Sequence, residues 1–311
     1  MERVLIAGVG ALGSYLAVRL HAANLDTHAL ARGRRLDSIR RDGVALETVS
    51  GVSIAKVRAY RDCAGLECAD LVLFCTKTPD IEATMELIST CVGPETVLVT
   101  LQNGVETPKM VAARFPGIPV LAARVHGFFE MVGDRVRHVG VEPSLAFGPI
   151  FATDQVPAQQ FAAVLSRAGI AGCLSPDIMG DLWEKLTLTS AFGGVGAATG
   201  LAAGPMRADA TSWALLGCAM QEVEALALSR GVKLTSGCVA RTLSFVAGFP
   251  PDATSSMKRD LETGRNSEYA SLTGAVIRMA AQSAVKVPAH HQIERMILAR
   301  GLLPHSYPGS A

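Results

Sequence analysis

Short apolar runs alternate with helical patterns over the first half of the chain. The apolar runs are rich in Val, Leu and Ile, which predicts buried strands at Val4–Ala7, Thr27–Ala31, Leu71–Cys75, Val97–Leu101, Val120–Val125 and Glu142–Phe147. Helical patterns fall at Leu12–Ala23, Asp80–Ile88, Pro108–Phe115 and Gln155–Ala168. Strands that alternate with helices predict a Rossmann-type parallel sheet with helices on both faces.

The pattern changes at about Pro176, after which strand signals largely vanish. Helical patterns then follow one another at Asp177–Phe192, Met206–Arg230, Val239–Val246, Ala253–Thr263, Ser267–Ser283 and Ala289–Leu298. We therefore expect an α/β domain over residues 1–174 and an all-helical domain over residues 175–311.

Composition agrees with two compact domains. The chain has 311 residues, of which 49% are hydrophobic and 18% charged, which is typical of a globular protein with a substantial core. Lys plus Arg number 29 and Asp plus Glu 28, for a net charge of +1. This balance gives no electrostatic reason to expect nucleic acid or an anionic membrane as a partner.

Cysteine usage and two uncharged stretches bear on location. The seven cysteines form no CxxC pair and, with the histidines, no zinc-ligand spacing, so we expect reduced thiols in a cytoplasmic protein and no metal. Val4–Val18 looks like a short signal peptide, but its glycines suit a ligand-binding turn better. Leu186–Met206 is uncharged yet rich in glycine, which favours a buried helix over a membrane span.

The first strand leads into a glycine-rich turn, Gly8-Val9-Gly10-Ala11-Leu12-Gly13. In a G-x-G-x-x-G turn between a strand and a helix, the first glycine permits the tight turn and the second lets backbone N–H groups approach a pyrophosphate. The third lets the helix pack on the strand. The helix N-terminus, from Ala11 and Leu12 onward, then faces the phosphates. The turn predicts a dinucleotide site, although a purely structural turn has the same pattern.

The end of the second strand favours NADP(H) over NAD(H). NAD enzymes usually carry Asp or Glu there, whereas this chain reads Ala29-Leu30-Ala31-Arg32-Gly33-Arg34-Arg35. A guanidinium can pair with the 2′-phosphate of NADP(H), and Arg32 is the best candidate, with Arg34 or Arg35 assisting. The alternative is a solvated basic turn.

Two further side chains follow strands of the same sheet. Lys77 comes after the strand that ends near Cys75, and Asn103 after the strand that ends near Leu101. Because ligands of open parallel sheets bind beyond the carboxyl ends of the strands, both residues are expected at the cofactor cleft. Either is otherwise an ordinary turn residue.

Several motifs in one order resemble the ketopantoate reductases (2-dehydropantoate 2-reductases). They are the 8–13 turn, Arg32-Gly33, Thr76-Lys77, Gln102-Asn103-Gly104, Trp183-Glu184-Lys185-Leu186 and Ser255-Ser256-Met257, continued by Asp260, Gly264-Arg265 and Ser267-Glu268. The resemblance covers nearly the whole chain. It implies NADPH-dependent reduction of a 2-oxo acid to a 2-hydroxy acid (2-dehydropantoate to pantoate, in pantothenate biosynthesis), at a site between a Rossmann domain and a helical domain.

The resemblance also implies roles for single residues. Lys185 corresponds to the family's catalytic lysine, which protonates the ketone oxygen, and Glu268 to the glutamate that positions it. Asn103 and Lys77 correspond to residues that touch cofactor and substrate, and Ser256 to a serine that contacts the substrate.

The chain departs from the family on the face of the helix that carries Lys185. Residues 185, 189 and 193 share that face, and the family usually has substrate-binding asparagines at the last two, where this chain has Thr189 and Gly193. We expect fewer hydrogen bonds to a small polar acid there and more open volume.

Several alternatives follow from this departure. One is a reductase of the same family for a bulkier carbonyl or an imine, and another is an NADP(H)-binding sensor without activity. The apolar helical half is compatible with a homodimer.

Overall fold

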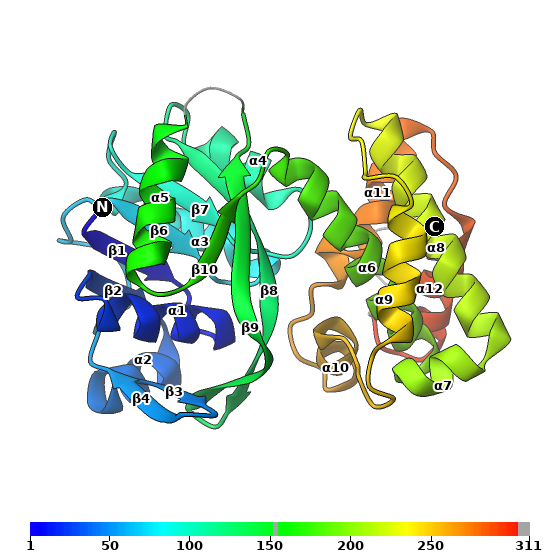
Figure 1. The fold of residues 1–311 in the computed structure, drawn as a ribbon, viewed down its shortest axis with the longest axis horizontal. Helices are drawn as coiled ribbons and strands as arrows, with labels where there is room; N and C mark the ends of the chain where they lie inside the picture. The colour runs from blue at the N-terminus through cyan, green and yellow to red at the C-terminus, as the bar shows by residue number, and fades with distance from the viewer. Residues whose placement is uncertain (152–154, 304–311) are drawn as a thin grey trace. The chain divides into compact units, whose positions relative to one another are not determined.

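The computed structural model describes residues 1–151 and 155–303, and these form two compact units (Figure 1). The first unit comprises Met1–Gln102 and Glu106–Ile178, and the second comprises Asn103–Val105 and the chain from Met179 onward. The chain therefore leaves the first unit for three residues after its fifth parallel strand.

The first unit contains all the described strands: β1 (Arg3–Ala7), β2 (Asp26–Leu30), β3 (Val44–Thr48), β4 (Gly51–Ala55), β5 (Arg58–Tyr60), β6 (Leu71–Phe74), β7 (Val97–Thr100), β8 (Val120–Val132), β9 (Arg135–Pro149) and β10 (Ala171–Leu174). Its helices are α1 (Ala11–Ala22), α2 (Gly33–Asp42), η1 (Thr78–Asp80), α3 (Ile81–Ile88), η2 (Ser89–Cys91), α4 (Thr107–Arg114) and α5 (Val156–Arg167).

All of these strands belong to one sheet, in the order β4-β3-β9-β8-β7-β6-β1-β2-β5, with β10 paired to β9. Pairing is parallel from β8 through β7, β6, β1 and β2 to β5. The carboxyl ends of these strands therefore lie along one edge of the sheet. β8 and β9 form a long antiparallel pair, and β3 and β4 a short one.

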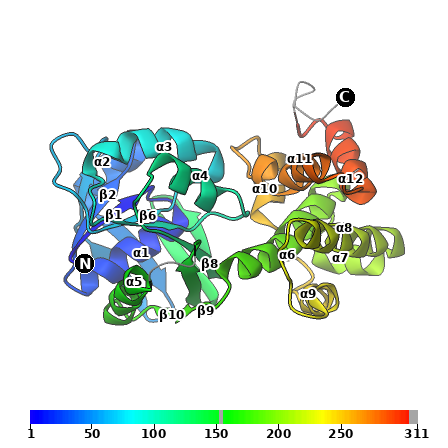
Figure 2. The ribbon, with the colours of Figure 1, turned by 90° about the horizontal axis from the view of Figure 1, so that it is seen from above.

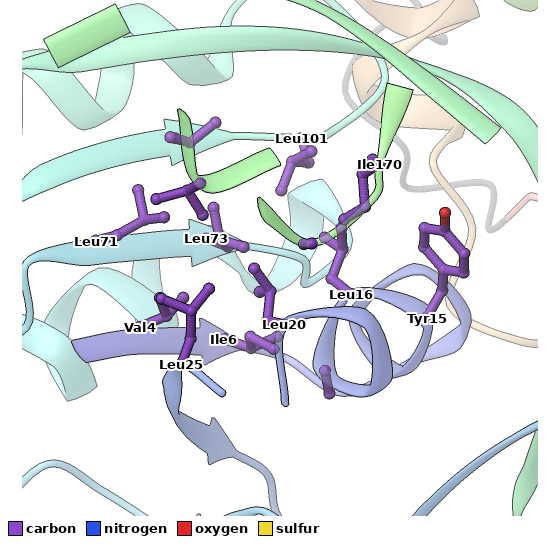
Figure 3. Packing of buried hydrophobic residues seen from close by; sticks show 14 of the residues in the cluster. Val4, Ile6, Tyr15, Leu16, Leu20, Leu25, Leu71, Leu73, Leu101 and Ile170 are labelled. Carbon is purple, nitrogen blue, oxygen red and sulfur yellow. The ribbon is translucent and has the colours of Figure 1, made fainter. Parts of the chain in front are cut away.

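Alternation along β1 explains why both faces of the sheet are covered. Val4 and Ile6 pack with Leu16 and Leu20 of α1, as Figure 3 shows. Leu5 and Ala7 belong instead to a second cluster that includes side chains of α3 and α4. Helices α1 and α5 accordingly lie on one face, and α3 and α4 on the other (Figure 2).

The second unit is helical over its described residues. Its elements are α6 (Ile178–Thr199), α7 (Ala203–Ala208), α8 (Ala210–Ser229), α9 (Cys238–Ala247), α10 (Ser256–Glu262), η3 (Tyr269–Ser271), α11 (Thr273–Ser283) and α12 (Pro288–Ala299). A Cβ at Gly194 of α6 would lie 2.9 Å from Thr273 Oγ1 and 3.0 Å from Ile293 Cγ2. Glycine therefore lets α11 and α12 approach α6 closely.

The predicted fold class, a Rossmann-type sheet followed by a helical domain, is confirmed. The pattern did not predict α2, β3, β4, β5 or β10, nor the antiparallel pairs. The helix expected over Met206–Arg230 is interrupted at Asp209, whose carboxylate accepts the N–H of Ser212 and caps α8. The uncharged stretch from Leu186 does not form one long helix, because α6 ends before Gly200, which has a φ of +79°.

Within residues 1–151 and 155–303, no helix has the length and apolar character that a membrane span needs.

Candidate functional site

The glycine turn after β1 has the geometry that its sequence predicts. Gly8 has a φ of +102°, and its N–H donates to the Leu30 carbonyl at 3.1 Å. A Cβ at Gly8 would lie 2.6 Å from Thr76 Cγ2, and a Cβ at Gly13 only 2.0 Å from the Gly8 oxygen. Neither position has room for a side chain, so the turn and the start of α1 are packed tightly against the sheet.

Gly10 differs from the other two glycines, because a Cβ there would meet nothing within 4 Å. Gly10 is the N-cap residue of α1, no side chain caps this helix, and its first turn holds no acidic residue. The N–H groups at the start of α1, near Ala11 and Leu12, therefore face an open space suited to an anion. A pyrophosphate fits this arrangement.

A cavity of about 250 Å³ lies beside the turn. Its polar lining comes from the loops that follow β1, β2, β5 and β6, and includes Arg32, Arg35, Arg61 and Asp80. The Arg32 side chain is 74% exposed, and its Nη2 donates to Asp80 Oδ1 at 2.7 Å. Arg32 thus lies where the end of β2 predicts it, with a carboxylate already bound to it.

Arg35 braces the glycine turn. Its Nε donates to the Val9 carbonyl at 3.0 Å, its Nη2 to Ser14 Oγ at 2.7 Å, and its Nη1 to the Asp134 carbonyl at 2.8 Å. Burial lowers the pKa of this guanidinium, and the nearby Asp134 carboxylate partly opposes the effect. Three of its five donors are engaged, while Arg34 is exposed and does not line the cavity.

Sequence reasoning missed Arg61. This residue follows β5, which pairs in parallel with β2, and the Ala31 N–H donates to the Tyr60 carbonyl at 2.9 Å. The strand is only three residues long and was not recognised, so its carboxyl end was not considered. The signal available in the sequence was the alternation of apolar Val57 and Ala59 with charged Lys56 and Arg58.

A larger cavity, of about 390 Å³, is lined by Arg3, Asp26 and Arg58, the first residues of β1, β2 and β5. Because ligands of parallel sheets bind at the carboxyl ends of the strands, the smaller cavity is the candidate site for a dinucleotide.

Gln102 joins the ends of β6 and β7. Its side-chain amide donates to the Phe74 carbonyl at 2.9 Å and to the Thr76 carbonyl at 2.8 Å. Lys77 comes directly after Thr76 in the sequence and is the N-cap residue of η1. It therefore lies just past the carboxyl end of β6.

Asn103 and Glu268 are 165 positions apart in sequence, and the structure brings them together. Asn103 Nδ2 donates to Glu268 Oε2 at 3.1 Å, and Glu268 is only 7% exposed. Gly104, with a φ of +96°, supports the contact, because a Cβ there would lie 2.7 Å from the Ser271 carbonyl oxygen. The buried carboxylate is thus held by an amide donor, as a positioning residue needs to be.

Lys185 and Thr189 lie one turn apart on α6, and both are half-buried. Thr189 Oγ1 donates to the Lys185 carbonyl at 3.0 Å, so the hydroxyl keeps only acceptor capacity for a ligand. Thr189 therefore supplies less than the two-sided amide of an asparagine would.

The open volume expected beside Gly193 is absent. A Cβ at Gly193 would lie 2.9 Å from Cε and 3.7 Å from Cβ of Met257, a side chain that is 1% exposed. This expectation was wrong because a flexible thioether from α10 fills the space that the missing side chain leaves. Ser255 Oγ would lie 3.3 Å away and also caps α10, whereas Ser256 is exposed.

Comparison with known proteins covers both units. The family model "Ketopantoate reductase PanE/ApbA" matches residues 4–150, and the corresponding C-terminal model matches residues 177–300. The chain belongs to the ketopantoate reductase family. It is therefore an oxidoreductase, and the resemblance drawn from the ordered motifs is confirmed.

Individual members of the family and its fold are similar over nearly the full chain. A 2-dehydropantoate 2-reductase from Nostoc is 25% identical over 301 residues, 93% of each chain. The crystal structure of a family member from Ralstonia eutropha JMP134 is 31% identical, with a TM-score of 0.87 over 96% of this chain and 97% of that one. D-mandelate dehydrogenase with NADH and anilino(oxo)acetate, at 18% identity, shares the fold, with a TM-score of 0.86 over 96% of this chain and 99% of that one.

Proposed function

We propose that this member of the family reduces a 2-oxo acid to a 2-hydroxy acid with NADPH. The observation that carries the cofactor assignment is the cavity beside Gly10, which is lined by both Arg32 and Arg61. Two guanidinium groups beside an uncapped helix N-terminus suit a dinucleotide with an added phosphate. In this proposal the turn residues Gly8, Gly10, Ala11, Leu12 and Gly13 hold the pyrophosphate, and Lys77 and Asn103 lie nearer the nicotinamide.

The second unit supplies the acid–base chemistry in this proposal. Lys185 is the proton donor, and Glu268, held by Asn103, positions it. Thr189 and Ser256 contact the substrate in this proposal, whereas Met257 covers Gly193. We accordingly propose a cofactor domain over residues 1–174 and a substrate domain over residues 175–311.

The reaction balances with these groups alone. Bound NADPH supplies the hydride that the carbonyl carbon accepts, and the C=O π bond opens toward oxygen. The Lys185 ammonium stabilises the growing negative charge and transfers its proton to that oxygen, leaving a 2-hydroxy acid and a neutral lysine that regains a proton from solvent. Glu268, held by Asn103 in a buried position, orients the lysine in this proposal.

Family membership makes 2-dehydropantoate the first substrate to test. Thr189 and Gly193 offer fewer donors than asparagines, and the buried Met257 side chain fills the space beside Gly193. A 2-oxo acid with a less polar side chain is therefore the second candidate, because a pocket that lacks donors loses little when the substrate hydroxyl is missing.

Steady-state assays with a panel of 2-oxo acids, each with NADPH and with NADH, test the proposal. We expect the highest kcat/KM with NADPH, and a loss of about 10²–10⁴-fold in kcat for Lys185→Ala. Lys233→Ala, which changes an exposed lysine of the same unit, serves as the control. NADPH binding without turnover of any carbonyl compound would support a sensor instead, and full activity of Lys185→Ala would remove the lysine from the mechanism.

Location and assembly are also proposals. All seven cysteines are free thiols, which favours a reducing compartment and hence the cytoplasm. A homodimer is compatible with the apolar helical unit, and sedimentation of the full chain decides between monomer and dimer.

A further inference from the structure

Asp80 is the one acidic residue among those that line the cavity beside the glycine turn. Its carboxylate is bound to Arg32, the residue whose guanidinium is proposed to hold the 2′-phosphate, at 2.7 Å. The carboxylate therefore occupies one of the guanidinium donors that the phosphate could use.

The backbone of Asp80 is firmly held. Its N–H donates to the Lys77 carbonyl at 2.9 Å, and its own carbonyl accepts from Thr84 Oγ1 at 2.7 Å. The Asp80 side chain is 31% exposed, against 74% for Arg32. Of the two partners, the arginine is the one with room to change position when a ligand enters.

The two dinucleotides differ in what they ask of this pair. NADH carries a ribose hydroxyl at the relevant position and leaves the pair intact. NADPH carries a phosphate of nearly two negative charges at neutral pH, which must share or displace Asp80 on Arg32 and is repelled by the carboxylate. The ion pair therefore weakens the binding of NADPH selectively.

We propose that Asp80 is a specificity-determining residue whose carboxylate competes with the 2′-phosphate for Arg32 and so limits the preference for NADPH over NADH. This inference rests on the proposed use of NADPH. Arg61 lies in the same cavity, and no ion pair of Arg61 is present among residues 1–151 and 155–303. Its guanidinium is thus free to take the phosphate before Arg32 exchanges partners.

Fluorescence titration of the full chain with NADPH and with NADH tests the competition. For Asp80→Asn we expect about a tenfold lower Kd for NADPH and less than a twofold change for NADH, since removing one charge a few ångströms from a nearly divalent anion is worth about that factor in water. Glu82→Gln, an exposed carboxylate of the neighbouring helix outside the cavity lining, should leave both constants unchanged.

The pH dependence of NADPH binding distinguishes charge competition from a structural effect of the substitution. Near pH 5.5 the 2′-phosphate takes up a proton, so the gain from Asp80→Asn should be smaller there than at pH 8. High salt should reduce the gain as well, because the groups are exposed. Asp80→Ser provides the same test if the amide variant folds poorly.

The outcomes separate this inference from the proposed function. If the wild-type chain binds neither dinucleotide, the proposed function fails. The inference is overturned if the wild type binds NADPH but Asp80→Asn leaves the ratio of the Kd values for NADPH and NADH unchanged, or raises the Kd for NADPH. In either case Asp80 does not compete with the phosphate.

Discussion

Single residues of the glycine turn have separable tasks. Gly13 is required by packing, because the Gly8 oxygen occupies the place of a Cβ, and backbone atoms cannot move aside cheaply. Gly10 is not required by packing, since its Cβ would stand in open space. Packing thus explains the third glycine, whereas the second is explained only by the proposed dinucleotide.

A pair of alanine variants tests this division. Gly13→Ala should lower the free energy of unfolding by about 3 kcal/mol or more, because of the clash. Gly10→Ala should change the free energy of unfolding by less than about 1 kcal/mol. It should nevertheless raise the Kd for NADPH at least about tenfold, because the methyl group stands where the pyrophosphate approaches. Urea unfolding and dinucleotide titration measure the two effects. Equal loss of stability in both variants would contradict the assignment.

At the scale of elements, α2 is tied to the glycine turn by Arg35. The guanidinium reaches from α2 to the Val9 carbonyl and to Ser14 of α1, so α2, the glycine turn and α1 share one set of hydrogen bonds. Both arginines line the cavity, but Arg32 at the N-cap of α2 pairs with Asp80, whereas Arg35, one turn later, binds the glycine turn.

Arg35→Met keeps the apolar stem and removes these hydrogen bonds. We expect a loss of about 1–3 kcal/mol in stability, because the Val9 carbonyl loses its donor, together with weaker binding of both NADPH and NADH. Arg34→Met, on the exposed side of α2, is the matched control. Thermal unfolding and titration with both dinucleotides give the measurement, and a loss confined to NADPH would mean that Arg35 is a phosphate ligand rather than a brace.

At the scale of the whole molecule, carboxylates in both units link stability to pH. Burial would raise the pKa of Asp70, but the backbone N–H groups of Arg3 and Glu2 donate to it, and the net pKa lies below the usual 3.8. Burial would also raise the pKa of Glu262, but the positive charges of Lys258 and Arg300 outweigh this effect. The pKa of Glu262 therefore lies below the usual 4.5. The contribution of each carboxylate to stability is complete above its pKa in the unfolded chain. That contribution is lost as the pH falls through its lower pKa in the folded protein.

Unfolding should therefore become easier in acid. We expect the midpoint of thermal unfolding to fall progressively as pH drops below about 5, since the unfolded chain binds more protons there. Asp70→Asn should lower the free energy of unfolding at pH 7 by about 1 kcal/mol after solvent screening, and hence the unfolding midpoint by about 2–4 °C. Below about pH 3 the midpoints of the variant and the wild type should coincide. Circular dichroism melts at several pH values test this, with Glu95→Gln, an exposed carboxylate, as control. A constant gap at all pH values would exclude the linkage.

Features that depend on local pattern could be predicted from the amino-acid sequence. The runs at β1, β6 and β7 are strongly apolar and bounded by turns, so their burial follows from composition alone. The glycine turn, the position of Arg32 and the ordered family motifs are local as well. Shorter elements gave weaker signals: β5 has three residues, and α2 shows its helical period through only two large apolar residues, Leu36 and Ile39, in a stretch that also fits a basic turn.

Contacts between side chains that are distant in sequence became known from the folded structure. Met257 fills the space beside Gly193, Asn103 holds Glu268, and Asp80 pairs with Arg32 across 48 positions. The physical reason is the same in each case. A contact of this kind depends on the register and packing of whole elements, whereas a sequence pattern reports only how each element divides its own residues between core and solvent.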